Sequence, residues 1–175
     1  MMKQQISSEK KALYERRALF AALLIVFALL QNTPHLLPGI LGAHALILIP
    51  LAVCLGMFEK AVVAALFGTL AGVFWDVTVA SGDGYNAMIL MLFATISSVL
   101  ISYLMRNNIS TALLLSFAAI IIYMLLHWFI FVVCSGATGG FVTLFTFYLP
   151  STIYTAVFAP LIYILLRALL RKIKE

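Results

Sequence analysis

Six long apolar runs dominate this chain, and short polar breaks separate them. Runs of this length predict membrane-spanning helices, because about 20 apolar residues are needed to cross the hydrocarbon core of a bilayer. The predicted spans cover residues 18–33, 40–57, 61–80, 85–105, 109–134 and 141–166. Since every break is short, successive helices are expected to be antiparallel neighbours. The pattern therefore predicts an all-α integral membrane protein, a bundle of six transmembrane helices.

The positive charges are arranged asymmetrically around these spans. All 11 Lys and Arg residues lie before the first span, after the last, or in the breaks that follow the second and fourth spans. Short loops rich in Lys and Arg stay on the cytoplasmic side, so both termini are expected to be cytoplasmic. Three regions result: a basic cytoplasmic segment (1–17), partly a surface helix over 8–17, a transmembrane domain (18–166) and a basic cytoplasmic tail (167–175).

Composition supports a membrane protein and indicates which classes of partner it contacts. Hydrophobic residues make up 65% of the chain and charged residues 10%, against about 45–50% and about 25% in soluble domains. The net charge is +5, and the basic residues flank the predicted spans. We therefore expect them to contact anionic lipid headgroups, and we expect no nucleic acid partner. Cys54 and Cys134 lie in apolar runs at different depths and are expected to be small core residues. No metal or cofactor site is predicted.

The span over 61–80 carries small residues at four-residue intervals. Ala64, Gly68, Gly72, Asp76 and Ala80 share one helix face. A Gly-x-x-x-Gly pair allows another helix backbone to approach closely in a membrane. The stripe is compatible with packing inside the bundle and with a dedicated partner interface.

Asp76 is the one carboxylate placed firmly inside a predicted span. Intramembrane acids are costly, so this side chain is a candidate ligand for an ion or substrate, or an anchor for a partner. The alternative is a carboxylate near the outer surface that reaches water or caps the following turn. His127 lies in the same outer half and could pair with Asp76, and His44 lies at the outer start of its span. These three side chains form a candidate polar cluster.

Catalytic motifs are missing from the sequence. It contains no HExxH, no CxxC, no phosphate-binding glycine loop and no Ser/His/Asp set that the spans would bring together. A single buried acid is too little for a mechanism that needs two carboxylates. We therefore predict no catalytic residues and no enzyme.

The motif around Asp76 resembles the central signature of the MreD family of bacterial rod shape-determining membrane proteins. That signature is a G-x-x-x-G-x-x-x-D stripe followed by a glycine-containing turn and G-x-N-A at the start of the next span. The matching residues here are Gly68, Gly72, Asp76, Gly84, Asn86 and Ala87. Chain length, span number and basic tail are also similar to that family. Where many members carry Pro-Asp at the start of the second span, this chain has Gly42-Ala43-His44.

The resemblance implies a non-catalytic scaffold of the cell-elongation complex in the bacterial cytoplasmic membrane. Such a protein would bind the bitopic protein MreC, and through it the RodA glycosyltransferase, its transpeptidase partner and MreB filaments. The Gly68/Gly72 stripe, or the outer ends near Asp76, would then dock a segment of MreC, and Gly72→Leu would abolish that contact without preventing insertion.

A second class of protein has a similar layout. The substrate-binding subunits of energy-coupling-factor vitamin transporters also have six spans and cytoplasmic termini, and their first span carries an Ala-x-x-x-Ala stripe, present here as Ala18 and Ala22. In that case Asp76, His44, His127 and Trp128 would line an outer cavity for a small vitamin. A membrane enzyme is the least favoured class.

Overall fold

The computed structural model describes residues 2–33, 45–78, 83–136 and 140–174, and all regular structure in these ranges is helical. Three helical stretches are long and apolar enough to cross a membrane: Tyr85–Tyr103, Ile109–Val133 and Leu144–Lys172. Two further apolar helices are shorter, Leu48–Phe58 and Ala61–Asp76. The chain thus has the apolar helices of a multi-pass membrane protein.

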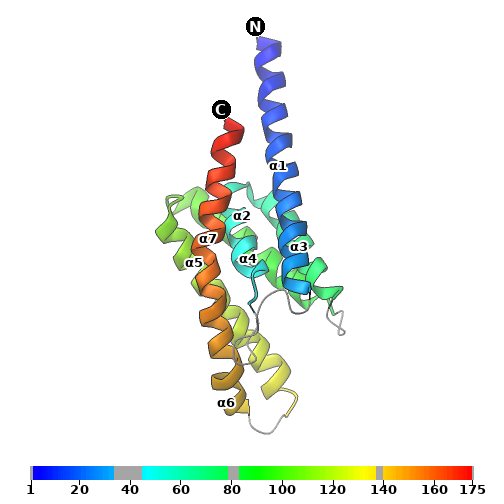
Figure 1. Ribbon diagram of the computed structural model, residues 1–175, viewed down its shortest axis with the longest axis vertical. Helices are drawn as coiled ribbons and strands as arrows, with labels where there is room; N and C mark the ends of the chain where they lie inside the picture. The colour runs from blue at the N-terminus through cyan, green and yellow to red at the C-terminus, as the bar shows by residue number, and fades with distance from the viewer. Residues whose placement is uncertain (1, 34–44, 79–82, 137–139, 175) are drawn as a thin grey trace.

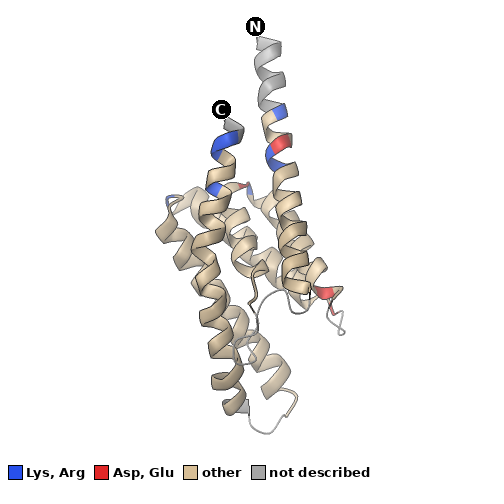
Figure 2. Ribbon diagram, in the orientation of Figure 1, with Lys and Arg blue, Asp and Glu red and all other residues tan. Residues whose placement is uncertain are grey.

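Both termini lie at the same end of the molecule. Helix α1 (Met2–Asn32) is continuous, so the basic segment and the first predicted span form one rod. Helix α7 (Leu149–Lys174) runs to the same end, beyond the predicted limit of 166 (Figure 1). Figure 2 shows that the Lys and Arg positions of the described residues gather there, whereas the remainder of the described bundle carries none. We refer to this as the terminal end.

The short helix α2 (Leu48–Phe58) is the buried axis of the bundle. Every residue from Leu48 to Met57 is buried. It contacts α1, α7, α3 (Ala61–Asp76), α4 (Tyr85–Tyr103) and α5 (Ile109–Trp128). A helix that is apolar on all sides can be surrounded in this way without burying an unpaired polar group.

The second helix begins later than the sequence predicts. Residues 45–47 are not helical and the helix starts at Leu48, whereas residues 40–44 lie outside the described ranges. Side chains from other helices bind the free N–H groups: Leu48 N donates to Gln31 Oε1 (2.9 Å), and Leu46 N donates to Thr155 Oγ1 (3.0 Å). Irregular backbone at membrane depth needs such partners. Pro50, which has no N–H, fits in the first turn.

The other predicted boundaries also shift. Helix α3 ends at Asp76 rather than 80, and a turn follows over residues 77–78. Helix α5 continues as a π-helix, η1 (Phe129–Val133). The last span is composite, because α6 (Gly140–Thr143) and the π-helix η2 (Leu144–Tyr148) precede α7. The second π segment ends just before Pro150, where a ring without an N–H interrupts the regular ladder.

Candidate functional site

The small-residue stripe of α3 lies against α4. A Cβ atom added at Gly68 would overlap the Leu90 backbone, and one added at Gly72 would overlap the backbone of Asn86 and Ala87. The glycines therefore let two helices approach more closely than any side chain would allow. Of the two roles that the sequence leaves open for this stripe, the structure shows packing inside the bundle. A partner helix could reach Gly68 and Gly72 only by displacing α4.

Asp76 caps the start of α4. Its Oδ1 accepts from Asn86 N (3.2 Å) and Asn86 Nδ2 (2.8 Å), and its Oδ2 accepts from Ala87 N (2.9 Å). Gly84 leads into the helix with φ +70°, a conformation that glycine adopts without a steric penalty. The carboxylate thus binds the free N–H groups at the positive end of the α4 dipole. With both oxygens engaged and the side chain buried, Asp76 has the capping role rather than that of an open ligand.

Asn86 connects this cap to α5. Its side-chain Nδ2 binds Asp76, and its Oδ1 accepts a hydrogen bond from Tyr123 Oη (2.6 Å). Trp75, next to Asp76, stacks on the Tyr123 ring at 5.3 Å. Three helices therefore meet through one chain of hydrogen bonds. We use the name outer corner for Gly72, Asp76, Asn86, Ala87 and Tyr123, because they lie toward the end of α3 that is away from the terminal end.

The predicted pairing of Asp76 with His127 does not occur. His127 Nδ1 instead lies 2.8 Å from Tyr148 Oη, and its ring contacts Phe131 at 4.5 Å and Tyr123 at 5.8 Å between centroids. His127 lies in α5 and Tyr148 ends η2, so this contact joins these two elements. The third member of the predicted cluster, His44, lies outside the described residues.

A small cavity lies beside the outer corner. Its volume is about 190 Å³. The lining is largely aromatic and apolar: Leu46, Trp75, Tyr123, Met124, His127, Phe147, Tyr148 and Ser151. Of the residues expected to line an outer cavity, His127 does so, whereas Asp76 and Trp128 do not. Within the described part of the chain, the buried Ser151 Oγ has no hydrogen-bond partner.

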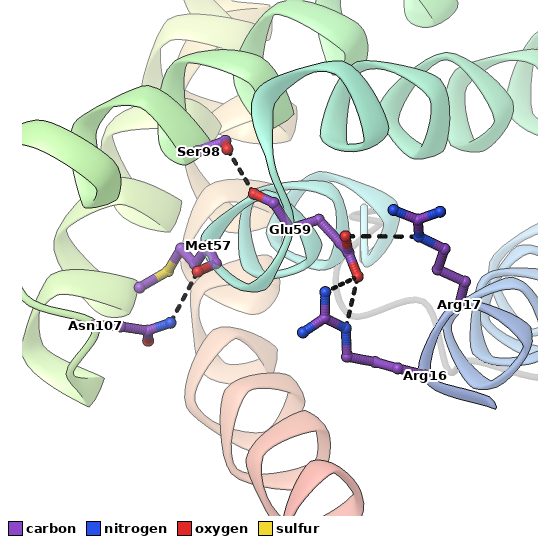
Figure 3. Close-up of polar contacts among 6 residues, drawn as sticks. All are labelled: Arg16, Arg17, Met57, Glu59, Ser98 and Asn107. Atoms are coloured by element: carbon purple, nitrogen blue, oxygen red, sulfur yellow. Dashed lines mark hydrogen bonds and ion pairs between the residues drawn. The ribbon is translucent and has the colours of Figure 1, made fainter. Parts of the chain in front are cut away.

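A second polar site lies at the terminal end and was missed by sequence reasoning. The side chain of Glu59, 1% exposed, accepts from Arg16 Nε (2.7 Å) and pairs with Arg16 Nη2 (2.6 Å). Its other oxygen faces Arg17 Nε at 3.9 Å, which is an ion pair too long for a hydrogen bond. Figure 3 shows both arginines reaching from α1 to this carboxylate. A signal was present, because Glu59 is the one acid between residues 18 and 75 and a buried acid needs a partner.

Backbone carbonyls around Glu59 are bound as well. Ser98 Oγ donates to the Glu59 carbonyl (2.6 Å), and Asn107 Nδ2 donates to the Met57 carbonyl (2.8 Å) (Figure 3). Asn107 Oδ1 in turn accepts from Tyr163 Oη of α7 (3.0 Å). The tight turn between α2 and α3 is thereby held by α1, by α4 and by the segment that leads into α5.

The polar groups of both sites are engaged mainly with one another. Among the described residues, no three His, Cys, Asp or Glu side chains gather as a metal site would require. In the structure, these groups link helices to one another through hydrogen bonds and ion pairs. Comparison of the chain with protein-family models, with curated proteins and with solved structures finds no match.

Proposed function

We propose that this chain is a non-catalytic scaffold of the bacterial cell-elongation complex, a member of the MreD family that binds an MreC-like bitopic protein. The observation that carries the proposal is the outer corner. The residues of the resembling motif are spread over two helices in the sequence, yet they act as one structural unit. Gly68 and Gly72 allow α4 to pack closely on α3, and Asp76 caps the start of α4 by accepting hydrogen bonds from Asn86 and Ala87.

A scaffold needs a rigid surface at a fixed place in the membrane. The outer corner supplies rigidity, because close backbone packing and three hydrogen bonds to one carboxylate fix the α3–α4 hairpin. Hydrogen bonds to a charged group contribute about 1.5–3 kcal/mol each. Such a hairpin can present a constant face to a partner without any chemical step.

The charge distribution supports the orientation of this scaffold. Lys and Arg gather at the terminal end (Figure 2), and such charge is retained in the cytoplasm during insertion. In the proposed arrangement both termini are cytoplasmic, and the outer corner faces the periplasmic side of the cytoplasmic membrane. MreC-like proteins cross the membrane once, so their segment outside the cytoplasm would lie near this corner.

Because Gly68 and Gly72 are buried against α4, the proposed docking surface does not include them. We place it on the exposed outer end of the α3–α4 hairpin, around Val77 and Met88, whose side chains are 79% and 61% exposed. These residues flank the cap formed by Asp76 and are therefore held in a fixed position. This placement keeps the expectation that the outer ends near Asp76 bind the partner.

Affinity purification tests the proposal. The tagged chain is extracted from native membranes in a mild detergent, and the recovered proteins are identified by mass spectrometry. An untagged strain and an unrelated tagged multi-pass protein serve as controls. We expect an MreC-like protein with elongation synthases. Recovery of a coupling subunit with paired ATPases would overturn the proposal in favour of a transporter.

The aromatic cavity keeps a vitamin-binding subunit as the second candidate. It has an aromatic lining and an unpartnered Ser151 hydroxyl, as a ligand site would. Its volume of about 190 Å³ is below the roughly 300–1,000 Å³ of typical small-molecule pockets. A thermal-shift screen of the purified chain with water-soluble vitamins separates the two functions, because a scaffold gains no stability from any of them.

A further inference from the structure

A groove at the terminal end combines an apolar floor with unpaired positive charge. It lies along α7 beside the start of α5 and has a volume of about 260 Å³. Its lining residues are Ile109, Tyr163, Ile164, Arg167, Ala168 and Arg171. None of them belongs to the outer corner or contacts the Glu59 carboxylate, and only Tyr163 also bonds Asn107 near the α2–α3 turn. The groove is therefore a separate feature of the molecule.

The two arginines of the groove lie on one face of α7. Their spacing of four residues places them about 6 Å apart along the helix axis. Both are exposed, and neither forms an ion pair with a carboxylate of the described residues. This differs from Arg16 and Arg17, which both form ion pairs with Glu59. The guanidinium groups of Arg167 and Arg171 are free to bind an anion.

The depth of the groove fits a membrane surface. Tyr163 binds Asn107, which precedes α5 at the terminal end of the bundle. Arg167 and Arg171 follow one and two turns later, about 6 and 12 Å further along α7. The groove thus changes from apolar, at Ile109 and Ile164, to basic in the direction that leaves the bilayer.

We propose that this groove binds one anionic phospholipid, with the phosphate on Arg167 and Arg171 and an acyl chain along the apolar floor. A guanidinium binds phosphate oxygens through two parallel hydrogen bonds. Basic pockets beside transmembrane helices at the cytoplasmic surface recognise anionic headgroups in this way. Free phosphate would use the two arginines and leave Ile109, Ile164 and Ala168 without a contact.

Lipid binding to the full-length chain in detergent micelles tests the assignment. Native mass spectrometry measures the affinity for phosphatidylglycerol and for phosphatidylcholine with identical acyl chains. We expect preference for phosphatidylglycerol, and about 25-fold weaker binding in the R167Q/R171Q variant, since each basic contact contributes about fivefold. The matched control K11Q/K172Q removes the same charge from the terminal end outside the groove and should change the affinity only slightly.

A substitution that changes no charge distinguishes lipid binding in the groove from attraction to general surface charge. Ala168→Trp fills the groove and keeps both arginines, so phosphatidylglycerol binding should be lost. Leu165→Trp, on the same helix but outside the groove lining, is the matched control and should bind normally. Circular dichroism and gel filtration of each variant establish that the bundle is intact.

Three results would overturn the proposal. One is equal affinity for the two lipids. Another is equal loss in R167Q/R171Q and K11Q/K172Q, or no effect of Ala168→Trp, because the charge alone would then account for binding. The third is binding of inorganic phosphate alone as tightly as phosphatidylglycerol, which would make the two arginines an anion site to which the acyl chain contributes nothing.

Discussion

At the scale of single residues, two carboxylates determine how this membrane bundle is joined. Asp76 connects α3 to α4 at one end, and Glu59 connects the α2–α3 turn to α1 at the other. Each is buried, and each is bound by donors from another segment of the chain. In an apolar bundle a carboxylate without such donors would be strongly destabilising, so its partners are as essential as the acid itself.

The cap at Asp76 can be tested by removing its charge. Asp76→Asn keeps one acceptor oxygen but loses the charge-assisted bonds to Asn86 and Ala87. We expect a loss of about 2–3 kcal/mol in the free energy of unfolding. Thermal or denaturant unfolding in detergent measures it. Asp83→Asn is the control, because Asp83 is exposed; an equal loss in both variants would contradict the capping role.

The Glu59 site predicts a contrast between two basic residues of α1. Arg16→Gln removes the hydrogen-bonded partner of a buried carboxylate and is expected to cost about 2–4 kcal/mol, since breaking a buried pair leaves an uncompensated charge. Lys11→Gln removes an exposed pair with Glu15, and such pairs contribute at most about 1 kcal/mol. If both variants had the same free energy of unfolding, the buried Arg16–Glu59 pair would contribute no more to stability than the exposed pair.

At the scale of elements, the sequence predicts that the helices exist more accurately than it predicts where they begin and end or which segments they contact. Apolar runs predict the all-helical fold, and the Gly68–Gly72–Asp76 stripe correctly predicts one helix face. The late start of α2 depends on Gln31 and Thr155, which lie far from it in the sequence. For the same reason periodicity could not reveal that α4 covers the stripe, or that His127 binds Tyr148. Contacts between distant segments leave no periodic signal in a single sequence.

The packing of α3 on α4 changes the expected effect of Gly72→Leu. A side chain there would overlap the backbone of Asn86 and Ala87, so the two helices must separate. We expect a destabilisation of about 3 kcal/mol or more, at or above the upper end for overpacked cores, with partner binding lost as a consequence. Val73→Leu, on an exposed part of the same helix, should be neutral. Normal unfolding of Gly72→Leu with loss of the partner would restore the stripe as an interface.

At the scale of the whole molecule, orientation follows from charge at one end. Both basic termini lie at the terminal end (Figure 1, Figure 2). The Glu59 site pairs with the basic part of α1 and precedes α3, whereas the outer corner lies at the opposite ends of α3 and α4. If the terminal end is cytoplasmic, the corner and the exposed Cys134 face outward. The orientation therefore decides which partners each site can meet.

Thiol labelling measures this orientation. A membrane-impermeant maleimide added to sealed spheroplasts should label Cys134, which is exposed, and not Cys54, which is buried. In a C134S/K172C variant, labelling should appear only after the membrane is permeabilised. Labelling of K172C in sealed spheroplasts would place the termini outside and contradict the proposed arrangement.

Photo-crosslinking in growing cells tests the central claim, that the outer end of the α3–α4 hairpin binds an MreC-like partner. A photoreactive amino acid replaces Val77, and in a separate strain it replaces Val62, which is equally exposed at the opposite end of α3 (79% and 76%). We predict that the probe at Val77 forms an adduct with an MreC-like protein and that the probe at Val62 does not. An adduct with a transporter coupling subunit, or no protein adduct at Val77, would contradict the claim.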